Sequence, residues 1–255
     1  MDDKELTAKA QALPPVFGND HWSKARRALR DHMLSNDPGE MLRWSTIIAT
    51  MQVGDVEYMV VETDYLFDGD ANRWGAAVAD PGFGGAKEYG YAKKYMGGKP
   101  ASNLIHQAYY VKKWEERTGK KIGELNFIVE FGGGYGAMAY VCRQLGFEGV
   151  YMIYDFPIAS LLQEYYLSNV GIHDVWFSNA PFSFDADLFI SLWGITEAPL
   201  FDRSWVTDRI SAKHNMIVYT NQWYSINNDT WIRENFSSET EPLTHISPIL
   251  HLLIS

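Results

Sequence analysis

The stretch that decides the fold runs from residue 128 to residue 138 and reads Ile128-Val129-Glu130-Phe131-Gly132-Gly133-Gly134-Tyr135-Gly136-Ala137-Met138. Its apolar first part is typical of a strand that is buried on both faces. The glycines at positions 132, 134 and 136 then allow a sharp turn and a close approach to a ligand, because no Cβ intervenes. An apolar helix is expected after them, with its free N–H groups directed at the turn. The stretch therefore predicts a nucleotide-binding turn.

The residue types in this turn bear on which nucleotide it binds. Gly132, Gly134 and Ala137 also satisfy the G-x-G-x-x-G/A pattern of dinucleotide-binding enzymes, so an NAD(P)-dependent oxidoreductase must be considered. Glu130 disfavours that interpretation, because it ends the strand beside the turn, where a pyrophosphate would meet its carboxylate. A carboxylate there suits a ligand that carries an ammonium group with a sulfonium nearby, as S-adenosylmethionine does.

A second acidic residue follows where a second parallel strand would end. Asp155 closes the apolar run 150–154, and such a strand end presents an acid to the two hydroxyls of a ribose. The Glu-x-Gly-x-Gly-x-Gly turn and this later acid together resemble the class I S-adenosylmethionine-dependent methyltransferases. The resemblance implies a Rossmann-like α/β sheet with helices on both faces, and S-adenosylmethionine as the cofactor. The cofactor-binding residues that it implies are Glu130, Gly132, Gly134, Gly136, Asp155 and Phe156.

The helix expected over residues 101–120 sharpens the resemblance. Its apolar face is clear, and Ser102 is the candidate N-cap. This helix, with residues 130–136 and 154–157, resembles the bacterial sugar O-methyltransferase family over about residues 97–199. The resemblance implies a saccharide acceptor. Asn103, together with Gln107, is a candidate contact for the methionyl carboxylate, although ordinary polarity on a helix surface explains both equally well.

The sequence after the acidic turn predicts alternating helices and strands. Ligands of such a sheet bind outside the carboxyl ends of its strands. Ser191, Trp193 and Glu197 end or follow the predicted strand 187–193, so they are expected where cofactor and acceptor meet, with Ser191 binding the cofactor. The other predicted elements are a helix at 158–169, strands at 174–177 and 214–220, a helix at 230–236, and one or two strands at 243–254 interrupted at Pro248.

Methyl transfer to a sugar hydroxyl benefits from a positioned base, because the hydroxyl is a weak nucleophile at neutral pH. Glu197 is our first candidate for this base. His106 is the second, since imidazole titrates near the working pH. Each has a structural alternative: Glu197 capping the next helix, and His106 hydrogen-bonding to the cofactor or the cap. His245 and His251 lie in apolar surroundings and are expected to be core histidines.

The first 100 residues do not show the α/β pattern. We predict a mainly helical N-terminal cap over residues 1–100 and a cofactor-binding domain over residues 101–255. Helices are expected at 2–13 and at 23–34, the second capped by Asp20 or Ser23. The apolar runs 46–51 and 56–61 fit either a hairpin through Gly54-Asp55 or two helices. The sequence leaves open whether the cap closes over the site or joins the subunits of a homo-oligomer.

Composition narrows the function classes further. The net charge of −10 argues against a nucleic acid bound through its phosphates. The aromatic content of 15% fits an aromatic-walled pocket and an aromatic core equally well. The single cysteine, Cys142, excludes an internal disulfide and a zinc site built from several cysteines. No apolar run reaches membrane-spanning length and no signal-peptide pattern is visible, so we expect no membrane contact and a cytoplasmic location.

Three function classes follow from these observations. The first is an S-adenosylmethionine-dependent O-methyltransferase acting on a sugar or a sugar-containing small molecule. The second is an oxidoreductase that uses NAD(P) at the same turn, and the third is a binding protein that kept the cofactor fold and lost catalysis. No metal is predicted, because its only candidate ligands, Glu197, Asp202 and Asn221, are loosely spaced.

Overall fold

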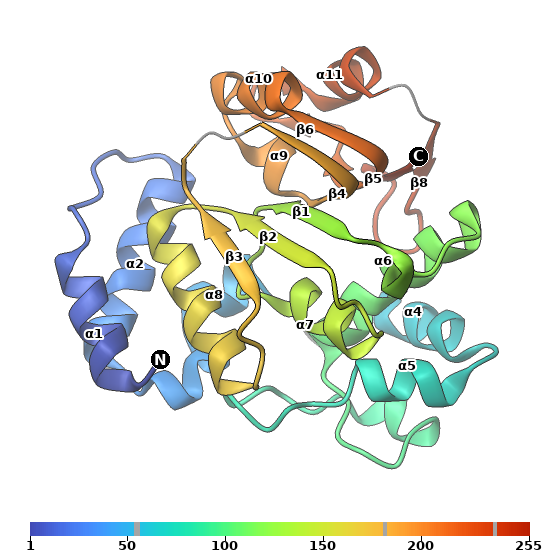
Figure 1. Ribbon diagram of the computed structural model, residues 1–255, viewed down its shortest axis with the longest axis horizontal. Helices are drawn as coiled ribbons and strands as arrows, with labels where there is room; N and C mark the ends of the chain where they lie inside the picture. Colours follow the sequence, from blue (N-terminus) through green and yellow to red (C-terminus); the bar gives the residue numbers. More distant parts are fainter. Residues whose placement is uncertain (54–56, 181–182, 237–238) are drawn as a thin grey trace.

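A seven-stranded sheet forms the centre of the computed structural model, which describes residues 1–53, 57–180, 183–236 and 239–255 (Figure 1). The strands lie in the order β3-β2-β1-β4-β5-β9-β8. Their bounds are Phe127–Phe131 for β1, Val150–Tyr154 for β2, Val175–Ser178 for β3, Phe184–Leu192 for β4, Ile210–Thr220 for β5, Thr240–Pro242 for β8 and Leu250–Ile254 for β9. The strands predicted at 150–154, 174–177, 187–193 and 214–220 are confirmed to within a few residues.

The pairing directions bring the predicted strand ends together. Strands β1 to β5 pair in parallel, and Glu130 at the end of β1 lies in register with Ile153 of β2 and Ile190 of β4. Strand β9 pairs with β5 in the antiparallel direction and separates it from β8. An all-parallel dinucleotide-binding sheet has its sixth strand in that place. The predicted fold class, a Rossmann-like methyltransferase sheet with helices on both faces, is confirmed.

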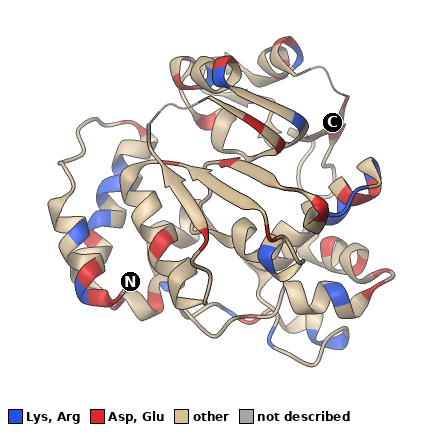
Figure 2. Cartoon of the chain, viewed as in Figure 1, with Lys and Arg blue, Asp and Glu red and all other residues tan. Residues whose placement is uncertain are grey.

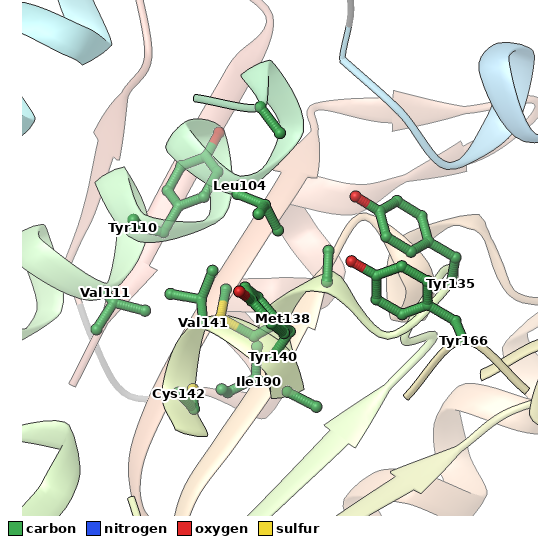
Figure 3. Close-up of a cluster of buried hydrophobic side chains, with 14 of the residues drawn as sticks. Leu104, Tyr110, Val111, Tyr135, Met138, Tyr140, Val141, Cys142, Tyr166 and Ile190 are labelled. Carbon is green, nitrogen blue, oxygen red and sulfur yellow. The ribbon is translucent and has the colours of Figure 1, made fainter. Parts of the chain in front are cut away.

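Helices cover both faces of this sheet (Figure 1). On one face lie α6 (Ser102–Thr118), α7 (Ala137–Gln144) and α8 (Pro157–Asn169), and on the other α10 (Leu200–Arg209) and α11 (Asn228–Asn235). Figure 3 shows how Leu104 and Tyr110 of α6 meet Met138 and Val141 of α7 in the buried layer. Cys142 of α7 is buried there as a free thiol. Because the strands are apolar on both faces, two separate hydrophobic clusters form, one on each side.

The first 100 residues are mainly helical, as predicted. Their elements are α1 (Asp3–Ala12), α2 (His21–Ser35), η1 (Pro38–Arg43), α3 (Ser45–Thr50), α4 (Tyr58–Phe67), α5 (Ala71–Ala77) and η2 (Gly90–Lys94). They share one hydrophobic core with the rest of the chain: α1 and α2 pack on α8, and α4 packs on α6.

Figure 2 shows the strands largely free of charged residues, which lie mostly on the surrounding helices and loops.

Two local predictions are wrong in detail, and one open alternative is decided. For the runs 46–51 and 56–61 the helical alternative holds among the described residues, which form α3 and the start of α4; Gly54-Asp55 lies outside the described residues. Ser102 is not the N-cap of α6, because Ala101 occupies that position and the Ser102 hydroxyl donates to the Val53 carbonyl at 2.8 Å. The last strands flank the segment around Pro248, with β8 ending before Leu243.

The short elements complete the chain and matter for the site. They are η3 (Ile122–Glu124), α9 (Gly194–Glu197), β6 (Gln222–Trp223) and β7 (Ile226–Asn227). Helix α9 starts directly after β4, and β6 and β7 form a two-stranded sheet directly after β5. Both therefore lie at the edge of the main sheet where the parallel strands end.

Candidate functional site

A cavity of about 800 Å³ opens at the carboxyl ends of the parallel strands. The glycine turn 132–134 and the end of β2 form part of its wall, and α9 with the β6–β7 segment forms another part. Helices α2 and α3, the segment after α3, and the first turns of α6, α7 and α8 supply further parts of the wall. The N-terminal region thus builds part of this cavity. A volume of this size lies in the range of small-molecule and cofactor sites.

The glycine turn is held so tightly that side chains are excluded from it. Gly132 and Gly134 have φ angles of 78° and 56° and line the cavity. A Cβ on Gly132 would meet the Cα of Gly194 at 3.0 Å, and one on Gly194 would meet the Phe131 carbonyl at 2.6 Å. Gly136 precedes α7 with a φ of 99°, packs against Leu167, and is not part of the wall. Only the first two predicted glycines therefore approach the cavity.

Glu130 is a buried acid without a cationic partner among the described residues. It is 3% exposed, lines the cavity, and accepts a hydrogen bond from the Tyr151 hydroxyl at 2.8 Å. Burial raises its pKa to about 8; the Tyr151 hydrogen bond lowers the value and the nearby Asp155 raises it. Burial makes its charged form costly, so a cation that enters the cavity would stabilise that form.

Asp155 lies across the same cavity at the end of β2. Its carboxylate accepts from the Phe156 N–H and from Gln163 Nε2, both at 2.8 Å. Gln163 Nε2 also donates to the Gly134 carbonyl at 3.0 Å, which ties the acid to the glycine turn. Burial raises the pKa of Asp155 to about 6. Two acids whose pKa values are raised by burial therefore face one cavity, and Phe156 lines it beside them.

Glu197 lines the cavity at the end of α9, where burial raises its pKa to about 7. The carbonyls on either side of it accept hydrogen bonds from the buried Arg203: Nε donates to Ala198 at 2.7 Å, and Nη2 donates to Thr196. Arg203 Nη1 donates to Asn228 Oδ1 at 2.7 Å. The sequence contains no signal for this clamp, because Arg203 lies in an ordinary amphipathic helix.

Asn103 lies in the cavity wall, but both ends of its amide are already used. Its Oδ1 accepts from the Val53 N–H at 3.1 Å, and its Nδ2 donates to the Tyr135 hydroxyl at 3.0 Å. Asn103 therefore joins the segment after α3 to the glycine turn, and Gln107 lies beside it in the wall. Tyr135 is a wall residue that sequence reasoning missed.

Ser191 lies behind the wall and not in it. Its side chain is fully buried, and its hydroxyl donates to the Phe131 carbonyl at 3.1 Å and accepts from the Ile195 N–H at 2.8 Å. The predicted direct contact with a cofactor is thus replaced by a link between the end of β1 and α9. This link holds the backbone that carries Glu130 next to the backbone that carries Glu197.

His106 also lies behind the wall. It is fully buried, with Nδ1 2.7 Å from Glu62, and its ring stacks on Trp193 with centroids 5.6 Å apart. His245 Nε2 lies 3.3 Å from the second oxygen of Glu62. His106 does not line the cavity, whereas Trp193 does. The sequence predicted His106 near the acceptor, but its pairing with Glu62 holds the ring away from the cavity.

Trp193 does not continue β4, contrary to the predicted strand 187–193. Its φ is 65°, a conformation that is strained for a residue with a Cβ. Its N–H donates to the Val218 carbonyl at 2.7 Å, which keeps the turn attached to β5. Strain of this kind collects where a surrounding structure fixes a side chain for a purpose. Here it directs the indole to the cavity wall against His106.

Aromatic side chains from both ends of the chain meet at the cavity, and sequence reasoning located none of them. His21 and Trp22 begin α2, and Trp223 and Tyr224 follow β5. The ring centroids of His21 and Trp223 are 6.1 Å apart at an interplanar angle of 82°. We call His21, Trp22, Trp223 and Tyr224 the aromatic rim. In the sequence, only the aromatic content of 15% indicated an aromatic wall for the cavity.

Two further observations bear on the predictions. Within the described ranges, no group of three or more His, Cys, Asp or Glu side chains is arranged to hold a metal ion. None of the helices formed by the described residues is both long and apolar enough to cross a membrane.

No protein-family model matches the chain, and no curated protein matches it. Some solved structures are similar at low identity. Magnesium protoporphyrin IX methyltransferase from Synechocystis PCC 6803, solved with S-adenosylmethionine bound, has a TM-score of 0.44 and 14% identity, with 80% of this chain and 98% of that chain covered. A Thermoplasma acidophilum protein has a TM-score of 0.43 and 15% identity, covering 59% and 86%. A 16S rRNA methylase has a TM-score of 0.41 and 12% identity, covering 59% and 84%. We infer the function of this chain from its own cavity.

Proposed function

We propose that the protein is an S-adenosylmethionine-dependent methyltransferase. The observation that carries this proposal is the pair Glu130 and Asp155: two acids with raised pKa values at neighbouring strand ends, facing one cavity beside a glycine turn. Glu130 is suited to an ammonium group, since a cation offsets the cost of its buried charge. Asp155 is suited to ribose hydroxyls, which donate hydrogen bonds. The bound cofactor supplies a methyl group already activated by the positive charge on its sulfur.

The same pair argues against the NAD(P) alternative. A pyrophosphate at the glycine turn would bring negative charge beside Glu130, which is buried and has no compensating cation among the described residues. Two like charges in a site of low dielectric repel strongly. The antiparallel β9 between β5 and β8 is a second difference from the all-parallel dinucleotide-binding sheet.

We further propose that the acceptor group is a hydroxyl of a sugar or a sugar-containing small molecule, with Glu197 as the base. The pKa of Glu197, raised to about 7, suits a base that takes a proton near neutral pH. The acceptor oxygen forms a bond to the methyl carbon while the carbon–sulfur bond breaks, and the hydroxyl proton passes to the Glu197 carboxylate. The aromatic rim supports a saccharide, because sugar rings present apolar C–H faces to aromatic side chains.

The remaining predicted residues take supporting roles in this proposal. Gly132 and Gly134 admit the cofactor to the backbone, and Phe156 borders its nucleoside end. Gly136 starts α7, and Ser191 holds α9 against β1. Asn103 shapes the wall through Tyr135. We propose that His106 positions Trp193, in place of the catalytic role that its sequence context favoured.

Calorimetry tests the cofactor part of the proposal. We expect S-adenosylmethionine and S-adenosylhomocysteine to bind the full chain and NAD not to bind. Glu130→Gln is expected to weaken both by at least about tenfold, since a hydrogen-bonded charge in a buried site contributes about 1.5–3 kcal/mol. Glu148→Gln, an exposed acid outside the cavity, is the matched control and is expected to leave affinity unchanged. The proposal would be overturned if NAD binds and neither S-adenosylmethionine nor S-adenosylhomocysteine does.

A sugar panel tests the acceptor part. The protein is incubated with S-adenosylmethionine carrying an isotope-labelled methyl group and with neutral sugars, and the products are read by mass spectrometry. Label in a sugar supports O-methylation. Tight cofactor binding with no label in any sugar would favour the third alternative, a protein that kept the fold and lost catalysis.

A further inference from the structure

The charges of the cavity wall are strongly one-sided. The wall contains the acids Asp20, Glu130, Asp155, Glu197 and Asp202. Among the described residues, its only lysine or arginine is Arg26. In the proposed function Glu130 and Asp155 serve the cofactor. Asp20 caps α2 by accepting a hydrogen bond from the Ser23 N–H, which leaves Glu197 and Asp202 on the acceptor side.

Arg26 does not offset the acids on the acceptor side. Its guanidinium lies over the Phe156 ring, 4.3 Å from the centroid, and Nη2 donates to the Ser23 hydroxyl at 3.2 Å. Its charge also lowers the pKa of the neighbouring Asp20, whose main stabilising contact is the hydrogen bond from Ser23. The contacts of the Arg26 guanidinium are thus with Ser23 in the first turn of α2 and with the ring of Phe156.

The aromatic rim lies where the wall is open to solvent. Tyr224 is 72% exposed, and the Trp223 and Tyr224 rings meet edge to face with centroids 5.1 Å apart. Tyr224 has a φ of 49°, so its backbone is held in an unfavourable conformation at this point. Trp22 lies 6.5 Å from Phe156 between ring centroids and continues the rim toward the cofactor end. All four side chains of the aromatic rim line the cavity.

We infer that the aromatic rim with Glu197 and Asp202 forms an acceptor subsite that takes a sugar ring without phosphate or carboxylate groups. Stacking on the rim accounts for the ring, and the two carboxylates accept hydrogen bonds from its hydroxyls. An anionic acceptor would bring a third negative charge close to these acids at reduced dielectric, where repulsion is strong. The subsite selects neutral or amino-bearing sugars. This inference rests on the proposed function, because it assigns the rim to the acceptor.

Matched neutral and phosphorylated sugars test the selection. Glucose with glucose 6-phosphate, and N-acetylglucosamine with its 6-phosphate, are titrated into the full chain with S-adenosylhomocysteine present, and binding is followed by tryptophan fluorescence and by saturation-transfer NMR. We expect at least one neutral sugar to bind, and its phosphate to bind at least about tenfold more weakly. Equal or tighter binding of the phosphates, or no binding of either neutral sugar, would overturn the inference.

Substitutions locate the subsite. Tyr224→Ala and Trp223→Ala are expected to weaken the neutral sugar about tenfold and to leave the affinity for S-adenosylhomocysteine unchanged. Trp176→Ala is the control, because Trp176 is 60% exposed on the edge strand β3 and lies outside the cavity wall. Asp202→Asn is expected to reduce the discrimination against the phosphorylated sugar severalfold. If the rim variants bind sugar like the unaltered chain, the rim is not the subsite.

The two proposals fail in different ways. The sugar titration is repeated without S-adenosylhomocysteine. If S-adenosylhomocysteine does not bind, while the neutral sugar still binds and its binding still depends on the aromatic rim, the methyl-donor assignment alone is contradicted. Intact binding of that compound, with no rim-dependent sugar binding, contradicts the acceptor subsite alone.

Discussion

Tyr151 donates its hydroxyl hydrogen to Glu130 at 2.8 Å, from β2 to the neighbouring β1, and both side chains are buried. This hydrogen bond favours the charged form of Glu130, while burial opposes it more strongly and raises the pKa to about 8. The acid is thus poised between its two forms near neutral pH. A cationic ligand decides the balance, because its charge stabilises the carboxylate.

Removing this hydrogen bond is expected to weaken cofactor binding. In Tyr151→Phe the pKa of Glu130 rises further, so a smaller fraction of the acid is charged at pH 7. We expect the affinity for S-adenosylhomocysteine at pH 7 to fall about tenfold, in line with a hydrogen bond to a charged group. The pH at which affinity reaches its plateau should move upward. Calorimetry across a pH series measures both; an unchanged profile would show that Tyr151 does not act through Glu130.

The unfolding free energy of the ligand-free protein is expected to depend on Glu130. Its folded pKa of about 8 lies above the ordinary value of 4.5 for a glutamate, so the unfolded state binds fewer protons between these two pH values. Stability contributed by the protonated acid is therefore fully present below about pH 4.5 and is lost as pH rises toward 8.

Glu130→Gln removes this pH dependence. The variant is expected to be more stable than the unaltered chain at pH 8 by up to several kcal/mol, since each pKa unit corresponds to about 1.36 kcal/mol. At pH 4.5 the two proteins should differ little. Urea unfolding at both pH values provides the measurement. A variant that is less stable at pH 8 would contradict the raised pKa.

Turnover is expected to depend on the charged form of Glu197. Because its pKa is raised to about 7, the rate should increase with pH through that value, as the carboxylate becomes available to take a proton. Glu197→Gln should lower kcat by about 10²–10⁴ and abolish this limb of the pH profile. Affinity for S-adenosylhomocysteine should stay unchanged. A variant with full kcat would exclude Glu197 as the base.

Arg203 is expected to position Glu197 without contacting substrate. Arg203→Met leaves the Thr196 and Ala198 carbonyls and Asn228 Oδ1 without their donor, which is expected to destabilise the fold by about 1–3 kcal/mol for each buried acceptor left unpaired. Arg203→Lys retains the charge and one or two of the bonds and is the milder variant. For it we expect a lower kcat with an unchanged affinity for S-adenosylhomocysteine. An Arg203→Lys enzyme with normal kcat would show that the clamp does not influence Glu197.

His106→Asn separates a supporting role from a catalytic one. The amide can still donate to Glu62, whereas the stack on Trp193 is lost. We expect a loss of stability of about 1–3 kcal/mol, as is usual for a disturbed buried polar contact. The rise of kcat with pH through about 7 should persist, because it reports the ionisation of Glu197. Disappearance of that rise in His106→Asn, with its persistence in Glu197→Gln, would reverse the two roles.

The parts of the site that the sequence predicted are those that short stretches define. Gly132 and Gly134 are recognisable because a turn of this kind needs positive φ angles, which both have, and at Gly132 a Cβ would also meet the backbone of Gly194. Glu130 and Asp155 are recognisable because each ends an apolar strand, and parallel strands end at one edge of a sheet. Six-residue apolar runs such as 46–51 have too few positions to reveal a hydrophobic period, so a helix and a strand fitted the sequence of this run equally well.

The parts that sequence reasoning missed or misplaced depend on contacts between distant segments. His106 has a typical catalytic residue type, yet its role depends on Glu62, which approaches from another helix. Ser191 ends a strand at the expected edge, but its hydroxyl turns to backbone groups of β1 and α9. Arg203 has no local signature because its two carbonyl partners, Thr196 in α9 and Ala198 directly after it, belong to a separate backbone segment.

The sequence by itself determined a glycine turn, two acids at adjacent strand ends and the α/β sheet that brings them together, because these features follow from backbone conformation and from the burial of apolar runs. Only the tertiary structure decided which polar residues face the cavity. His106 and Ser191 lie outside the cavity wall, and Arg203 holds the backbone next to Glu197. The rings of His21 and Trp223, which are far apart in the sequence, are in contact at the cavity. The physical reason is that buried polar groups must find partners, and those partners are set by packing and not by neighbours in sequence.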